Sequence, residues 1–257
     1  MPNFIKSYWK TLLFFVIAGL LGGFFTGFYL LNSYTEDIRQ QVIESLNAGA
    51  IPAELLLGLI SAMQAAAYGL ILGVIGILLG KKTGLWKDEI SITKKPLIIT
   101  IIIAIIGGLA LILPDLLFFG PHSQPIMDSY AIKPSVSYII ASIIYGGIIE
   151  EVMLRLFMMS AVAFLLHKVF GKNTEKPGTA ILAAANIVAA VLFAAGHLPA
   201  TFIMLGNSPM IIFRCFLLNG GFGLLFGYLY RKYGLRYSMI CHGGCHIISK
   251  LIWIIFI

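Results

Sequence analysis

The stretch VSYIIASIIYGGIIEEVMLRLFMMSAVAFLL, residues 136–166, decides the fold class of this chain. It is long enough to cross a bilayer as a helix, since about 20 mainly apolar residues suffice. It also holds three ionisable groups, the adjacent acids Glu150 and Glu151 and the base Arg155. A charge at the centre of a membrane helix costs roughly 2.5–3.5 kcal/mol on insertion scales. Such groups persist where they pair, face a cavity or act chemically, so the stretch indicates a membrane helix with a polar site.

The rest of the chain has the composition of a multi-pass membrane protein. Of its 257 residues, 59% are hydrophobic and 11% are charged, whereas soluble domains carry about 25% charged residues. The apolar runs are continuous rather than alternating, which disfavours a transmembrane β-barrel. We therefore expect an all-α, polytopic transmembrane helical bundle of about seven spans. The expected spans are Leu12–Leu31, Leu55–Leu79, Leu97–Phe119, Val136–Leu166, Thr179–Met204, Met210–Tyr230 and Ser238–Ile257.

The net charge of +7 reflects membrane orientation rather than nucleic acid binding. The basic residues collect before the first expected span and in the second, fourth and sixth loops. The first, third and fifth loops offer only Arg39 and Lys133. By the positive-inside rule, the N-terminus is expected in the cytoplasm and the C-terminus outside. The lipid bilayer is thus an expected partner, and nucleic acid is not.

Buried ionisable residues divide the chain near Pro134. The three spans of residues 1–134 hold few of them, whereas the four spans of residues 135–257 hold nearly all. We expect an N-terminal three-span region followed by a four-span core that carries the site. The three cysteines all lie in apolar runs, so no disulfide framework is expected.

The two adjacent acids are expected to differ in role. Glu151 and Arg155 are four residues apart with the acid first, which favours an ion pair on one helix face. Glu150 is turned about 100° from Glu151 around the helix, so it lacks this partner. One carboxylate is then neutralised, while the other keeps a free oxygen that suits a general base.

Three histidines in later apolar runs are candidates for the same site. His197 ends a run of small residues, and His242 and His246 are four apart, so these two imidazoles share one helix face. Two histidines at this spacing can bind a metal, with Glu150 and His197 completing the shell. No HExxH sequence is present. Zinc held by these three histidines and Glu150 therefore remains an alternative.

Three motifs resemble those of the CAAX protease and bacteriocin-processing family of intramembrane proteases, which is related to type II CAAX prenyl endopeptidase. The family pattern is Glu-Glu-x-x-x-Arg, then Phe-x-x-x-His, then His-x-x-x-Asn or a similar polar residue. This chain has, in that order, Glu150-Glu151-Val-Met-Leu-Arg155, Phe193-Ala-Ala-Gly-His197 and His242-Gly-Gly-Cys-His246. The resemblance covers about the last 120 residues.

The resemblance implies a glutamate-dependent intramembrane endopeptidase acting on a peptide or protein substrate in or near the membrane. By that analogy Glu150 activates water and His197 positions it. His242 and the residue four positions later stabilise the oxyanion. Glu151 with Arg155 supports this geometry. Residues 135–257 would then be a catalytic core of the CAAX protease type.

One departure from the family pattern concerns the metal alternative. His246 stands where the family usually has Asn. A neutral imidazole can donate a hydrogen bond as Asn does, but it can also ligate zinc. We favour chemistry without a metal or other cofactor, because a metal shell would have to be assembled across three helices.

Two other functions and one geometric question remain open. The chain could be a proton- or cation-coupled transporter, or a non-catalytic immunity or scaffold protein. Counted from the cytoplasmic loops, Glu150 and His197 lie about 24–27 Å deep, but His242 lies only about 8 Å deep. Convergence would require strong tilt, a broken helix or a deeper start of the last helix near Gly234.

Overall fold

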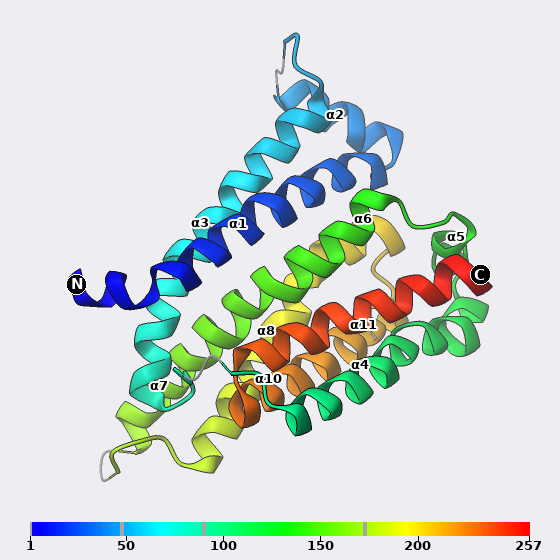
Figure 1. The fold of residues 1–257 in the computed structure, drawn as a ribbon. Helices are drawn as coiled ribbons and strands as arrows, with labels where there is room; N and C mark the ends of the chain where they lie inside the picture. The colour runs from blue at the N-terminus through cyan, green and yellow to red at the C-terminus, as the bar shows by residue number, and fades with distance from the viewer. Residues whose placement is uncertain (1, 47–48, 89–90, 172–173) are drawn as a thin grey trace.

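The computed structural model describes residues 2–46, 49–88, 91–171 and 174–257, which form helices joined by short connections (Figure 1). These ranges contain no β-strand, and the all-α fold class is confirmed. Within them, six helices are long and apolar enough to cross a membrane. The six are Asn3–Ser33, Ala53–Thr83, Lys94–His122, Thr179–Leu205, Pro209–Tyr233 and Leu235–Phe256.

The remaining expected span is the one that contains Glu150, Glu151 and Arg155. It is helical along its whole length. It consists of α6 (Val136–Ala141), η3 (Ser142–Glu150), η4 (Val152–Met159) and α7 (Ser160–Phe170). We call residues 136–170 the site helix. In η3 and η4 the turns are of the wider π type, which occurs frequently at functional sites. Its two acids and one arginine set it apart from the other six spans, and the chain has about seven spans in all.

The other helices follow the expected order, and several extend beyond the expected bounds. The long ones are α1 (Pro2–Ser33), α3 (Ala53–Thr83), α4 (Lys94–Pro114), α8 (Thr179–Leu205), α10 (Gly221–Tyr233) and α11 (Leu235–Phe256). Short segments extend or join them: η1 (Asp115–Phe119), η2 (Gly120–His122), α9 (Pro209–Cys215) and η5 (Phe216–Gly220). Two further short helices lie between spans and were not expected, α2 (Glu36–Leu46) and α5 (Gln124–Ala131).

Small residues let α1 and α3 pack closely on each other and on the site helix. A Cβ atom at Gly19 would lie 2.6 Å from the Ala65 carbonyl oxygen of α3. A Cβ atom at Gly76 would lie 2.7 Å from the Leu156 side chain of the site helix. Glycine at such contacts allows helices to approach closely where lipid offers no hydrophobic driving force. The N-terminal helix pair thus supports one side of the site helix.

A single residue separates α10 from α11. The helix begins at Leu235, directly after Gly234, whose φ of 107° is one that glycine adopts readily. The Ser238 hydroxyl already reaches the carbonyl of Phe226, 3.0 Å away and about two turns before the end of α10. The His242 ring then stacks on the Phe226 ring, with centroids 4.4 Å apart. His242 is thus packed inside the bundle about two turns from the start of α11.

Candidate active site

Glu151 is the anchored member of the two adjacent acids. Its side chain is 0% exposed, and its Oε1 lies 3.2 Å from Arg155 Nη1, so the ion pair indicated by the spacing is present. The same oxygen lies 2.9 Å from His242 Nδ1 on α11. The Ser238 hydroxyl contacts the other carboxylate oxygen. Both oxygens of Glu151 are therefore occupied by neighbouring side chains.

Arg155 is held on its other side by α8 and α10. Its Nη2 donates to the Gly223 carbonyl oxygen at 3.2 Å. Its guanidinium carbon lies 4.5 Å from the centroid of the Phe193 ring and 5.4 Å from that of the Phe226 ring. Aromatic faces attract a guanidinium within about 6 Å, and a buried charge needs such partners. Arg155 thus ties the site helix to two neighbouring helices.

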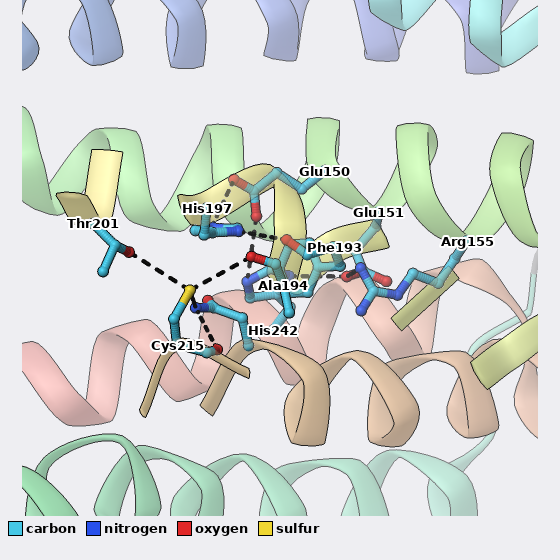
Figure 2. A network of polar contacts seen from close by, with 10 residues as sticks. Glu150, Glu151, Arg155, Phe193, Ala194, His197, Thr201, Cys215 and His242 are labelled. Carbon is cyan, nitrogen blue, oxygen red and sulfur yellow. Dashed lines mark hydrogen bonds and ion pairs between the residues drawn. The ribbon is translucent and has the colours of Figure 1, made fainter. Parts of the chain in front are cut away.

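Glu150 points into different surroundings, as Figure 2 shows. Its Oε1 lies 3.9 Å from His197 Nε2, and its Oε2 lies 3.9 Å from His242 Nε2. Both separations exceed hydrogen-bond distance, and within the described residues no hydrogen bond reaches this carboxylate. The Glu150 side chain is 19% exposed. We call Glu150, His197 and His242 the Glu150 cluster.

The two histidines of the Glu150 cluster present the same ring nitrogen to the acid. His197 Nδ1 lies 2.8 Å from the Phe193 carbonyl oxygen, and His242 Nδ1 lies 2.9 Å from the Glu151 carboxylate. Both oxygens only accept hydrogen bonds, so each Nδ1 carries a hydrogen. In the neutral rings each Nε2 then has a free lone pair, and both lone pairs face Glu150.

His246 lies beside the Glu150 cluster on the same face of α11. Its ring centroid is 5.1 Å from that of His242. A Cβ atom at Gly146, four residues before Glu150, would lie 3.2 Å from His246 Nε2 and 3.6 Å from His242 Nε2. Glycine at this position therefore leaves room for both imidazoles against the site helix. The buried Nδ1 of His246 has no hydrogen-bond partner in the part of the chain that the structure describes.

The four residues considered as zinc ligands are not gathered into a ligand shell. Within residues 2–46, 49–88, 91–171 and 174–257, no group of three or more His, Cys, Asp or Glu side chains is placed to hold a metal ion. Glu150, His197 and His242 come closest, with 3.9 Å between the carboxylate and each ring.

Two neighbours of the site were not anticipated. Ser238, which contacts Glu151, lies four residues before His242 and so on the same helix face. That spacing is the signal that could have found it. Cys215 lies beside His197's helix, with its thiol 3.5 Å from the Ala194 carbonyl and 3.6 Å from the Thr201 hydroxyl (Figure 2). These contacts hold α9 against α8 near the cluster.

A second buried carboxylate, also not anticipated, lies in η1. Asp115 is 0% exposed, and Arg214 of α9 donates to both of its oxygens at 2.5 Å. The Tyr130 hydroxyl of α5 donates to the same carboxylate at 2.9 Å. We call these three residues the Asp115 cluster. It joins three segments that are far apart in sequence.

Comparison with known proteins finds one family model that matches part of the chain. Residues 132–248 match the family model described as Type II CAAX prenyl endopeptidase Rce1-like. Over these residues the chain is similar to the CAAX protease family. No curated protein and no solved structure matches it significantly. The family indicated by the three motifs is thus confirmed, and the match contains all six candidate residues from Glu150 to His246.

Family and fold together establish a coarse functional statement. The CAAX protease family is a family of peptidases, so the chain is assigned to the hydrolases. Its apolar helices make it an integral, multi-pass membrane protein. A protein substrate near the membrane follows from both findings.

Proposed function

We propose that the chain is an intramembrane endopeptidase in which Glu150 activates water for attack on a peptide carbonyl. The observation that supports this is a carboxylate free of direct hydrogen bonds, flanked at 3.9 Å by two oriented imidazoles. Attack of water on an amide needs a base, and Glu150 has both oxygens available for that proton. Glu151 suits this role poorly, because Arg155, His242 and Ser238 occupy its oxygens.

The proposed reaction moves one proton in two steps. Glu150 takes a proton from water as the water oxygen bonds to the carbonyl carbon, and the carbonyl oxygen becomes an oxyanion. When the carbon–nitrogen bond breaks, Glu150 returns the proton to the leaving amine. The Nε2 lone pair of His197 accepts the second hydrogen of the water, which directs the first toward Glu150. The fixed Nδ1 contact to the Phe193 carbonyl maintains this orientation.

The oxyanion requires hydrogen-bond donors. The neutral form of His242 offers only a lone pair at Nε2, so His242 donates there as an imidazolium. The buried Glu151 carboxylate at Nδ1, 2.9 Å away, supplies the counter-charge for that form. His246 Nε2, against the same strip of the site helix, is the second donor that we assign to the oxyanion.

A zinc-dependent version of the same protease has one observation in its favour. Both imidazoles of the Glu150 cluster donate through Nδ1 to an oxygen and direct Nε2 inward, which is the usual arrangement of metal-bound histidines. We favour the metal-free reaction because no three-ligand group is assembled in the described part of the chain. Treatment with 1,10-phenanthroline should leave cleavage unchanged, and purified protein should contain no stoichiometric zinc. Loss of cleavage that zinc alone restores would favour the metal version.

The decisive experiment replaces the proposed base. Membranes from cells with the wild-type protein should contain new peptide N-termini that disappear with Glu150→Gln. We expect a loss of about 10²–10⁴-fold, the usual contribution of general acid–base catalysis. Glu44→Gln, in the exposed helix α2, is the matched control and should retain activity.

The same experiment separates the protease from its rivals. Thermal unfolding should show that the Glu150→Gln protein stays folded. Undiminished cleavage by that folded variant would eliminate Glu150 as the base. A biological effect that persists without any cleavage would favour a scaffold, and ion-dependent uptake into proteoliposomes that is lost with Glu150 would favour a transporter.

A further inference from the structure

The face of α11 opposite the Glu150 cluster borders a groove. At 100° per residue, Ile240 and His242 point about 200° apart around the helix. The groove measures about 670 Å³. On α11 it is lined by residues at helical spacing: Arg236, Met239, Ile240, Gly243, Gly244, Ile247 and Ile248. Most of these residues point away from His242, whereas Met239 lies at the edge of the face that carries the two histidines.

The other walls of the groove come from three helices and from the connection before α4, and they are apolar. They consist of Phe14 of α1, Ile92 of the connection, Ile101, Ala104 and Ile105 of α4, and Ile143 and Ile148 of the site helix. In Figure 1, α11 lies between α4 and the site helix. From Arg236 to Ile248 the groove follows α11 for about 18 Å. One leaflet of a bilayer core is about 15 Å thick, so this length suits one lipid chain.

A second cavity of about 630 Å³ adjoins the groove where α4 and α11 begin. The two cavities share Phe14, Ile92, Arg236 and Met239, and therefore adjoin each other. The second cavity is basic, and no acidic residue is among its described lining residues. Its basic lining residues are Lys10, Lys87, Lys232 and Arg236.

The Lys87 side chain is partly buried in the basic cavity rather than fully exposed to solvent. Its ammonium donates to the Lys232 backbone carbonyl at 2.5 Å rather than to a carboxylate. Partial burial lowers the pKa of Lys87 from its usual value, since burial disfavours the charged form. An anionic ligand in this cavity would offset that cost.

We propose that the two cavities together hold one anionic glycerophospholipid. Its phosphate occupies the basic cavity, and one acyl chain lies in the groove. A basic residue near an anionic lipid headgroup contributes about 1 kcal/mol, or about 5-fold in affinity. The groove lies behind α11 and against Ile148 of the site helix, so the lipid supports the two helices that bring Glu150 and His242 together.

The headgroup site can be tested without any measurement of proteolysis. Native mass spectrometry should show tighter binding of phosphatidylglycerol than of phosphatidylcholine with the same chains. The double variant Lys10→Gln, Lys87→Gln should lower phosphatidylglycerol affinity about 25-fold. The matched double variant Lys94→Gln, Lys95→Gln removes two lysines that do not line the cavity and should change affinity by less than about 3-fold.

The groove is tested by a bulky side chain in one wall. Ile105→Trp should fill the groove and lower retention of both lipids at least about 5-fold, the equivalent of about 1 kcal/mol. Ile106→Trp, on the same helix but outside the groove lining, should not. Equal affinity for the two lipids, or insensitivity to both the lysine and the Ile105 variants, would overturn the proposal. So would displacement of phosphatidylglycerol by an isoprenylated cysteine peptide, which would assign the groove to a substrate chain.

Discussion

Glu151 and Asp115 are both fully buried carboxylates paired with arginines, yet they lie in sites of different kinds. Glu151 pairs with Arg155, and Asp115 pairs with Arg214. Beside Glu151 stands a second acid, Glu150, with two imidazoles oriented toward it. The Asp115 cluster adds a tyrosine hydroxyl that completes its hydrogen bonding. A buried ion pair alone therefore reports helix packing, whereas a free acid beside such a pair indicates chemistry.

The largest expected effect comes from removing either arginine. Arg155→Met and Arg214→Met each leave a fully buried carboxylate without its counter-charge, which costs about 3–5 kcal/mol of unfolding free energy. Denaturant unfolding in detergent should show similar losses for the two variants. Cleavage per folded molecule should fall only for Arg155→Met. The ion-pair partner of Arg155, Glu151, contacts His242, whereas Asp115 and Arg214 have no contact with the Glu150 cluster in the described structure. An equal loss of specific activity would make the Asp115 cluster part of the catalytic machinery.

A smaller effect is expected when the carboxylates become amides. Glu151→Gln removes the negative charge at His242 Nδ1, which supplies the counter-charge for the imidazolium form that donates at Nε2 to the oxyanion. We expect cleavage to fall about 10–100-fold, or about 1.4–2.7 kcal/mol in transition-state stabilisation. Asp115→Asn is the matched change and should leave specific activity unaltered. Initial rates with a cleaved peptide would measure both, and unchanged rates in Glu151→Gln would remove the positioning role.

The two clusters also show what the sequence could and could not predict. Glu150, Glu151 and Arg155 were visible because three charges stand within six positions of one apolar run. Asp115 and Arg214 each stand alone in separate runs, 99 positions apart. Pairing of lone intramembrane charges of opposite sign is the signal that could have joined them. Local spacing does not supply such long-range contacts.

The point at which each span begins was the second feature that the sequence did not predict. Counting from the loops assumed that a loop separates the last two spans, whereas a single residue, Gly234, joins α10 to α11. Apolar run lengths predicted the order of the spans, because each run must cover the hydrocarbon core. They missed α2, whose polar sequence buries no residue, and α5, a helix of 8 residues.

The smallest effect is expected at an exposed counterpart of the two buried clusters. The Tyr8 hydroxyl lies 2.5 Å from Asp88 Oδ1 and 2.7 Å from Lys81 Nζ, and Lys81 Nζ lies 3.4 Å from Asp88 Oδ2. The hydrogen bond from Tyr8 lowers the pKa of Asp88 below its usual value, with Trp86 and Lys81 adding to the effect. The Asp88 side chain is 60% exposed, so water screens these interactions and their contribution is below about 1 kcal/mol.

The pH dependence of Tyr8→Phe tests this contrast between exposed and buried pairs. Since the folded pKa of Asp88 is depressed, its stabilisation is present above the unfolded value of about 3.9 and is lost as pH falls through the folded value. Tyr8→Phe should therefore lower the thermal midpoint slightly at neutral pH, by no more than about 2–4 °C. The difference from wild type should vanish once Asp88 is protonated. A difference that persists in acid would mean that the Tyr8 hydroxyl acts through its hydrogen bond from Lys81 Nζ, 2.7 Å away, rather than through the charge of Asp88.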